Sequence, residues 1–206
     1  MNDFSRPDGF VSVSEVIPDV LLDVRYYSTY NFVGERVDGY EAPVVLLTKE
    51  AAAALSLVNA DMRRKGLRLV LYDGYRPQRA VDHFVRWAES ADDSMRAAFY
   101  PDVEKRALFE RGFIARRSGH SRGSTIDLTL LDEKGGTPLD MGGPFDFFGE
   151  LSHPDSPAVT PVQHENRMLL REAMLAHGFK PLSTEWWHFT LKDEPYPDTY
   201  FDFPVR

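Results

Sequence analysis

The chain has 206 residues, a net charge of −8 and no cysteine. An acidic chain lacks the clustered lysine and arginine that phosphate binding needs, so nucleic acid is excluded as a partner. Without cysteine there are no disulfides or thiolate ligands, so any metal must be held by histidine and carboxylate side chains. No apolar run reaches the roughly 18 residues of a membrane helix, and the N-terminus lacks the pattern of a secretory signal. A cytoplasmic protein with no membrane partner is expected, with a mature form cut from a longer precursor as the alternative.

The first part of the chain is expected to be an irregular arm followed by a strand and a long loop. Within residues 1–19, Val11, Val13 and Val16 indicate a short extended piece, and the apolar run 20–26 is typical of a strand. Residues 27–43 contain two glycines and several aromatic residues without periodicity. A loop of that length is usually functional or disordered, and its aromatic content favours an ordered loop over a pocket, with the edge of the core as the alternative.

The next part predicts two strands alternating with two helices. A short apolar strand at 44–47 leads to Thr48, a good N-cap for a helix that ends at Gly66. Residues 67–72 predict a central strand, and Pro77 suits the first turn of the helix that follows it.

Three further elements precede the C-terminal part. Asp102 is expected to cap a short helix that runs through Arg111. Residues 126–130 alternate apolar and polar side chains, which predicts a strand with one buried face. Residues 132–160 are rich in Gly, Pro and Asp and predict a hairpin or loop excursion.

The C-terminal part begins with a strong helix start, because Thr160 is followed by Pro161 and by Gln163 at the third helical position. This helix should end at Gly178. A strand is expected at 187–191, and the aromatic, proline-rich tail 195–206 is expected to pack on the surface. With no linker and no internal repeat, residues 1–206 predict a single α+β domain, with a central, mostly antiparallel sheet flanked by helices.

Two motifs distant in sequence carry the residues that zinc prefers. Ser118-Gly-His-Ser-Arg-Gly-Ser-Thr-Ile-Asp127 offers His120 and Asp127, and Glu185-Trp-Trp-His188 offers His188. A catalytic zinc ion typically has three protein ligands and an open position for water, so one zinc ion per chain is expected on this trio. His120 and Asp127 are seven residues apart and would face opposite sides of one unbroken strand, so Gly123 should supply a bend.

Glu185 remains as a carboxylate beside the metal. A break between Glu185 and His188 is needed for both side chains to face the same ion. Glu185 can then take a proton from the metal-activated water and deliver it to the leaving amine. Arg76, at the end of a central strand, is the best-placed cation to stabilise the oxyanion.

Several motifs, in order, resemble the VanX-type D-alanyl-D-alanine dipeptidases. The resemblance covers the chain from about Tyr26 to its end, and the arm of residues 1–25 departs from the family. The motifs are Val37-Asp-Gly-Tyr-Glu41, Tyr72-Asp-Gly-Tyr-Arg-Pro77, Ser118 to Leu130, Glu185-Trp-Trp-His188, Asp193-Glu-Pro-Tyr-Pro197 and Tyr200-Phe-Asp-Phe-Pro204.

The resemblance implies a zinc metallopeptidase with the fold shared by D-Ala-D-Ala carboxypeptidases and the hedgehog N-terminal domain. It implies cleavage of free D-Ala-D-Ala into two D-alanines, with the ligands, base and arginine already assigned. It further implies that Asp146 faces the substrate amine, and that Tyr26, Asp73 and Ser118 help to line the pocket.

The expected partner is a small D,D-dipeptide, and a homo-oligomer is left open. Longer peptides should be excluded if no groove leads away from the amine end. A D,D-carboxypeptidase acting on peptidoglycan peptides is the first alternative and would need an open cleft. A zinc-binding module without catalysis is the second alternative, and Glu185 discriminates against it because a structural site has no use for a base. The sequence leaves open whether the biological role is glycopeptide resistance or recycling of D-alanine.

Overall fold

The computed structural model describes residues 5–206, and its centre is a mixed sheet of six strands. Five of these strands lie in the order β2-β4-β5-β8-β7, and β6 pairs with β5 beside them. β2 runs parallel to β4, whereas the other pairs in this sheet are antiparallel. A separate two-stranded sheet pairs β1 with β3. The strands are β1 (Phe10–Ser12), β2 (Leu21–Leu22), β3 (Leu46–Thr48), β4 (Leu67–Asp73), β5 (Thr125–Asp132), β6 (Thr137–Pro138), β7 (Phe179–Leu182) and β8 (Glu185–Leu191).

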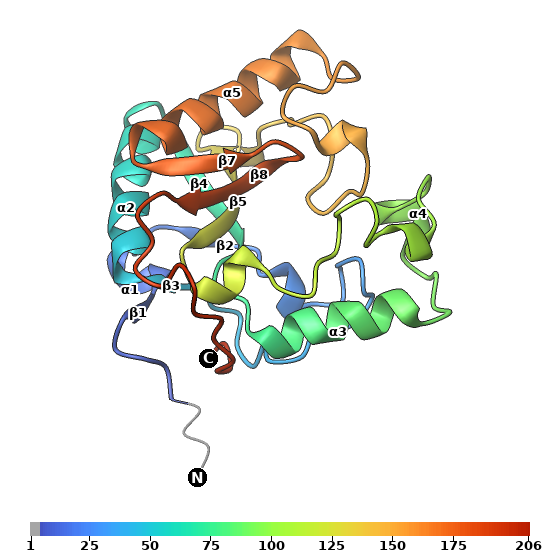
Figure 1. Ribbon diagram of the computed structural model, residues 1–206. Coiled ribbons are helices and arrows are strands. Elements are labelled where there is room, and N and C mark those ends of the chain that lie inside the picture. Colours follow the sequence, from blue (N-terminus) through green and yellow to red (C-terminus); the bar gives the residue numbers. More distant parts are fainter. Residues whose placement is uncertain (1–4) are drawn as a thin grey trace.

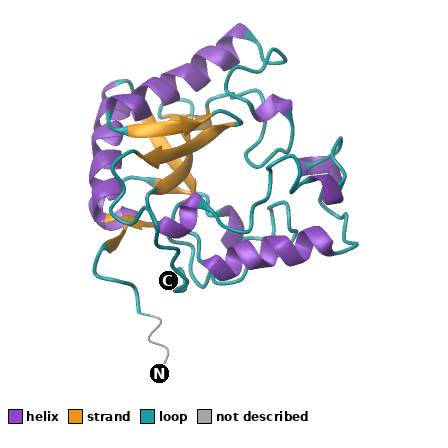
Figure 2. Cartoon of the chain, in the orientation of Figure 1, coloured by secondary structure: helices purple, strands orange, loops and turns teal. Residues whose placement is uncertain are grey.

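Helices surround this sheet, as the α+β prediction required. The α-helices are α1 (Val13–Val16), α2 (Lys49–Arg64), α3 (Gln78–Glu89), α4 (Arg96–Phe99) and α5 (Pro161–Ala176). α2 packs on β4, α5 packs on β7, and the two helices contact each other. Figures 1 and 2 show α3 on the opposite side of the molecule from α5, with long loops between them. One hydrophobic cluster includes side chains from Phe10 to Val205, so the described chain forms a single domain.

The expected helix caps are confirmed. The side chain of Thr48 accepts a hydrogen bond from the amide of Ala51 at the start of α2. Thr160 and Gln163 form a reciprocal capping box at the start of α5, in which each side chain accepts from the other's backbone N–H. Gly66, which follows α2, has a φ of +73° and takes the left-handed conformation common after a helix.

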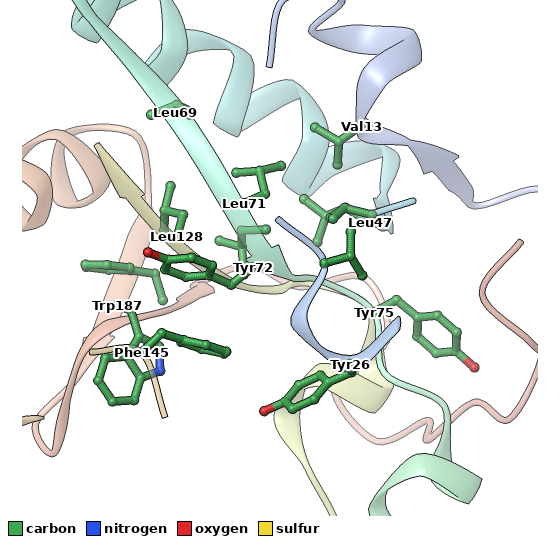
Figure 3. Close-up of a cluster of buried hydrophobic side chains, with 14 of the residues drawn as sticks. Val13, Tyr26, Leu47, Leu69, Leu71, Tyr72, Tyr75, Leu128, Phe145 and Trp187 are labelled. Atoms are coloured by element: carbon green, nitrogen blue, oxygen red, sulfur yellow. The ribbon is translucent and has the colours of Figure 1, made fainter. Parts of the chain in front are cut away.

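The strand β5 is buried on both faces, so the prediction of a single buried face is wrong. Ile126, Leu128 and Leu130 are fully buried, and Asp127 and Thr129 on the other face are only 2% and 1% exposed. The reason is that β5 lies between β4 and β8 in the middle of the sheet. The alternation of apolar and polar residues in β5 therefore separates a face that packs in the core from a face that carries buried polar side chains. Figure 3 shows Leu128 near the side chains of β4 within the core.

Two predicted elements are shorter than expected. The run 20–26 forms only β2 and a 3₁₀ turn at Arg25–Tyr27. The helix expected from Asp102 to Arg111 is reduced to one 3₁₀ turn at Lys105–Ala107. The Lys105 ammonium is drawn inward, where it donates to the carbonyl oxygens of Ser90 at 3.1 Å and of Asp92 at 2.8 Å. This tertiary contact fixes the turn in place of a longer helix.

The excursion 132–160 is confirmed as a loop region, which contains β6 and a 3₁₀ turn at Glu150–Ser152. The tail, by contrast, does not simply pack on the surface. Phe203 is 5% exposed and stacks on Tyr75 at a centroid distance of 4.1 Å, and Val205 is 1% exposed and forms a β-bridge with Tyr40. Among residues 5–206, no helix is long and apolar enough to cross a membrane.

Candidate active site

Three polar residues lie in a row across the middle of the sheet. Asp73 at the end of β4 pairs with Asp127 on β5, and Asp127 pairs with His188 on β8. The first pairing depends on a bulge, because one step along β5 from Leu128 to Asp127 corresponds to two steps along β4 from Leu71. Bulges redirect side chains near active sites. Here the bulge places Asp73 opposite Asp127.

His120 reaches the same place from a tight turn. Ser118 precedes a 3₁₀ turn at Gly119–Arg122, and its hydroxyl accepts a hydrogen bond from the amide of His120 at 3.3 Å. Gly123 then reverses the chain with a φ of +85°, a conformation that other residues rarely adopt. The expected bend between His120 and Asp127 is therefore present at Gly123.

The three predicted ligands come together with the spacing of a metal site. His120 Nε2 lies 3.2 Å from Asp127 Oδ2 and 3.2 Å from His188 Nδ1, and His188 Nδ1 lies 3.1 Å from Asp127 Oδ1. Ligand atoms about 2.0 Å from a tetrahedral zinc ion are separated by about 3.3 Å. The cluster of His120, Asp127 and His188 thus fits one small ion without rearrangement.

The surroundings of the ligands also suit a metal. The Nδ1 atom of His120 lies 2.7 Å from the carbonyl oxygen of Gly74, which can only accept, so Nδ1 carries the proton and Nε2 is left with its lone pair. Asp127 Oδ1 is buried, and no hydrogen bond to it is formed among the described residues even though His188 Nδ1 lies nearby. Two lone pairs that face each other at such a distance are typical of ligands that share a cation.

The charges in this cluster are strongly coupled. Burial disfavours the ionised form of Asp127, but the imidazoles of His120 and His188 outweigh it and hold the Asp127 pKa below its ordinary value. Burial lowers the pKa of His120, which keeps that ring neutral as a ligand must be. Burial acts in the same direction on His188, but the Asp127 carboxylate outweighs it and raises the His188 pKa.

Glu185 lies beside the cluster without belonging to it. Its Oε2 atom is 3.4 Å from His188 Nδ1. The break expected between the two residues exists, because Pro181 of β7 pairs with Phe189 while the next residue, Leu182, pairs with Glu185. Residues 186–188 therefore have no partner on β7, and the strand can turn Glu185 toward His188. Burial raises the pKa of the Glu185 carboxyl above its ordinary value.

Arg76 lies on the opposite side of Asp127 and is held by a buried carboxylate. Its Nε donates to Asp73 Oδ2 at 2.9 Å, and its Nη2 lies 3.7 Å from Asp127 Oδ2. The guanidinium packs over the ring of Tyr26 at 4.9 Å. The Tyr40 hydroxyl donates to the other oxygen of Asp73 at 2.6 Å. Asp73 itself is 1% exposed and lies behind Arg76, outside the cavity lining.

Asp146 and Tyr26 form a second polar pair at the cavity. The Tyr26 hydroxyl donates to Asp146 Oδ2 at 2.8 Å. Asp146 has a φ of +63°, the only left-handed residue other than glycine among residues 5–206. Burial and the negative charge of Asp127 raise the Asp146 pKa well above its ordinary value. An aspartate held in this conformation and environment is typical of a group kept for a cationic ligand.

These side chains surround one cavity of about 280 Å³. Of the predicted site residues, His120, Asp127, His188, Glu185, Arg76, Asp146, Tyr26 and Ser118 line it. The sequence interpretation missed the wall formed by residues 112–115 and Arg117, together with the apolar side chains Phe32, Phe84 and Phe148. The only available signal for that wall was its position directly before Ser118.

Comparisons with known proteins agree with this geometry. The M15 peptidase family described as D-ala-D-ala dipeptidase matches residues 6–206. A D-alanyl-D-alanine dipeptidase of Streptomyces coelicolor is 45% identical over 197 residues, which covers 95% of this chain and 98% of the relative. The Enterococcus faecalis protein of the same name is 43% identical over 199 residues, covering 96% and 98%. A third protein of that name, from Escherichia coli K12, is 37% identical over 181 residues, covering 88% and 83%.

The matched region contains the ligand cluster, the residues around it and the described chain almost from end to end. The His-Asp-His triad seen in the structure is the metal-binding set that a metallopeptidase requires. This chain belongs to the D-Ala-D-Ala dipeptidase family of M15 metallopeptidases.

Proposed function

We propose that this chain hydrolyses D-alanyl-D-alanine with one zinc ion held by His120, Asp127 and His188. The observation that carries the proposal is Glu185, a carboxylate 3.4 Å from one ligand but outside the ligand triad. A zinc ion in this place would polarise the scissile carbonyl and lower the pKa of a bound water to about 7. The protein itself must then move a proton, stabilise negative charge and hold the dipeptide.

Glu185 is the group that moves the proton. It lines the cavity and is close enough to the triad to reach a water between itself and the substrate carbonyl. It accepts a proton from the attacking water and passes it to the amine of the departing D-alanine, so the carboxylate is regenerated. Catalysis by a positioned base of this type typically contributes about 10²–10⁴-fold to the rate.

Arg76 stabilises the negative charge that develops on the carbonyl oxygen. Its guanidinium is fixed before substrate arrives, by Asp73 behind it and by the ring of Tyr26 beside it. A fixed cation needs no reorganisation when charge develops, which is why such groups are effective in closed sites. Asp73 therefore acts as a positioning residue for Arg76 and does not contact the substrate.

Asp146 binds the substrate ammonium, and Tyr26 orients it. The carboxylate lines the cavity and is 7% exposed, so an ammonium group there would replace lost solvation of the carboxylate. Ser118 lines the same cavity beside the turn that carries His120. The volume of about 280 Å³ lies just below the range of about 300–1,000 Å³ typical of drug-sized ligands, which favours a dipeptide over a longer peptide.

The test of the proposed function separates metal binding from turnover. Purified protein loaded with zinc should hydrolyse D-Ala-D-Ala but not L-Ala-L-Ala, and a chelator should abolish the activity. Glu185→Gln should lower kcat by at least about 10²-fold while one zinc ion per chain remains bound, as measured by metal analysis. Residual activity near that of the wild type would refute the base assignment. Equal turnover of an N-terminally blocked tripeptide would instead favour a carboxypeptidase.

A further inference from the structure

A free dipeptide has a carboxylate as well as an ammonium. The cavity has more carboxylates that could bind the ammonium than cations that could bind the carboxylate. Its lining contains the carboxylates of Asp127, Asp146 and Glu185 and the guanidinium groups of Arg76 and Arg117. The proposed zinc ion would offset the charge of Asp127, but Asp146 and Glu185 remain, and they would repel the substrate carboxylate unless a cation meets it. One of the two arginines is therefore expected to bind that end of the substrate.

Arg76 is poorly placed for this task. Its guanidinium already donates to Asp73, lies 3.7 Å from the ligand Asp127 and is 3.5 Å from the Tyr26 hydroxyl. The same hydroxyl donates to Asp146, so Arg76 lies on the side of the cavity where the ammonium binds. A substrate carboxylate placed there would also lie against Asp146.

Arg117 is free of these restraints. It is an exposed residue of the cavity wall, and its guanidinium lies over the ring of Tyr200 at 5.0 Å. Within residues 5–206, Arg117 forms no ion pair. Arg122, which approaches the same ring at 5.8 Å, is instead neutralised by two parallel hydrogen bonds of 2.8 Å to Glu194. The charge of Arg117 is thus available to a ligand.

The two ends of the cavity also have different origins. Asp146 belongs to the loop region 132–160, whereas Arg117 rests on the C-terminal tail. In Figure 1 the C-terminal tail lies below the sheet, whereas the later part of the loop region 132–160 lies toward the upper right. An extended dipeptide spans about 7 Å, so its two charged ends lie on either side of a scissile bond held at the metal. Asp146 and Arg117, which line the same cavity from different segments, can supply one charged group for each end.

We infer that Arg117 binds the terminal carboxylate of the substrate and thereby selects free peptides over peptides blocked at the C-terminus. This inference rests on the proposed function and adds its second recognition group. Tyr200 holds the guanidinium in place through its ring. The neighbouring Ser118 lines the cavity beside Arg117 and offers a hydroxyl to the same carboxylate.

The test compares two adjacent arginines with two substrates. Arg117→Gln removes the proposed contact, and Arg116→Gln is the matched control, because the Arg116 side chain lies over Phe109 at 5.7 Å and is not in the cavity lining. Steady-state kinetics of the zinc-loaded enzymes are measured with D-Ala-D-Ala and with its C-terminal carboxamide, which has no carboxylate charge.

Arg117→Gln should raise KM for D-Ala-D-Ala about tenfold, with a smaller change in kcat. A tenfold change corresponds to the lower end of the free-energy range for a charge-assisted hydrogen bond, as expected at a partly exposed site. Turnover of the carboxamide should be unchanged, Arg117→Lys should recover part of the loss, and Arg116→Gln should resemble the wild type. Equal effects of the Arg117 and Arg116 variants, or equal loss with both substrates, would overturn the inference. Wild-type enzyme that fails to cleave D-Ala-D-Ala would refute the proposed function itself, an outcome visible before any variant is measured.

Discussion

Gly123→Ala should destabilise the protein more than an ordinary glycine substitution. Gly123 has a φ of +85°, and a Cβ atom built there would lie 2.1 and 2.4 Å from two ring atoms of Phe10. That ring cannot move aside easily. It is 3% exposed and is enclosed by aromatic rings of Tyr75, Phe201 and Phe203 at centroid distances of 5.0–5.3 Å.

The magnitude has two parts that a control variant can separate. A left-handed backbone costs an alanine roughly 1–2 kcal/mol, and overpacking in a filled core typically costs about 1–3 kcal/mol more. Gly66→Ala has the first part alone, because Gly66 has a φ of +73° and no atom within 4 Å of the added Cβ. Gly123→Ala should therefore lose about 2–5 kcal/mol, and Gly66→Ala about 1–2 kcal/mol.

Urea unfolding of the two variants and the wild type gives their unfolding free energies, and thermal unfolding gives their midpoint temperatures. The midpoint temperature of Gly123→Ala should lie about 2–12 °C below that of Gly66→Ala, at 2–4 °C per kcal/mol for a chain of this size. Metal affinity should fall in Gly123→Ala alone, because this turn fixes the position of His120 relative to Asp127. Equal unfolding free energies for the two variants would refute the claim that the Phe10 cluster is rigid around the turn.

Three further predictions concern substrate binding, positioning and stability. KM for D-Ala-D-Ala should fall as pH rises through the pKa of Asp146, which lies above its ordinary value, because only the ionised carboxylate attracts an ammonium. Asp146→Asn should raise KM and remove that pH dependence. A variant whose KM keeps the pH profile of the wild type would contradict the assignment. Tyr40→Phe removes the hydroxyl that donates to Asp73 at 2.6 Å, so Asp73 should hold Arg76 less firmly. The variant should lose about 1–3 kcal/mol of unfolding free energy, and its kcat should fall more than its KM changes. Kinetics equal to the wild type would show that Arg76 needs no such support. Thr160→Ala should lower the unfolding free energy by about 0.5–2 kcal/mol through loss of the capping box, with kcat/KM unchanged in the same assay.

The features that the sequence predicted best are those set by local chemistry. Thr48 and Thr160 were recognisable as caps because an N-cap depends on the side chain itself and a few residues after it. The three residues of the metal-binding triad were recognisable because a metal site in a chain without cysteine restricts residue types strongly. The breaks at Gly123 and between Glu185 and His188 followed from strand geometry once the ligands were assigned.

The features that could not be predicted depend on tertiary contacts. The edge strand β7 contains Pro181, and proline argues against a strand unless the strand is known to lie at the edge of a sheet. The tail looked like surface because its prolines prevent regular structure, yet Phe203 and Val205 fill the core. Arg117 has no periodic or motif signal, and only the folded cavity brings it to the site.

The positions of Asp73, Asp127 and His188 and the positions of the substrate-binding groups should differ in how much change they tolerate during evolution. These side chains are spaced by the hydrogen-bonded ladders of three neighbouring strands. A change of one residue in the length of any of these strands would turn its side chain to the opposite face. The groups assigned to the two ends of the dipeptide, Asp146 and Arg117, instead belong to irregular segments that tolerate insertion and replacement. A descendant of this enzyme could therefore acquire a different peptide as substrate by changes in those segments, while the metal-binding triad stays in place.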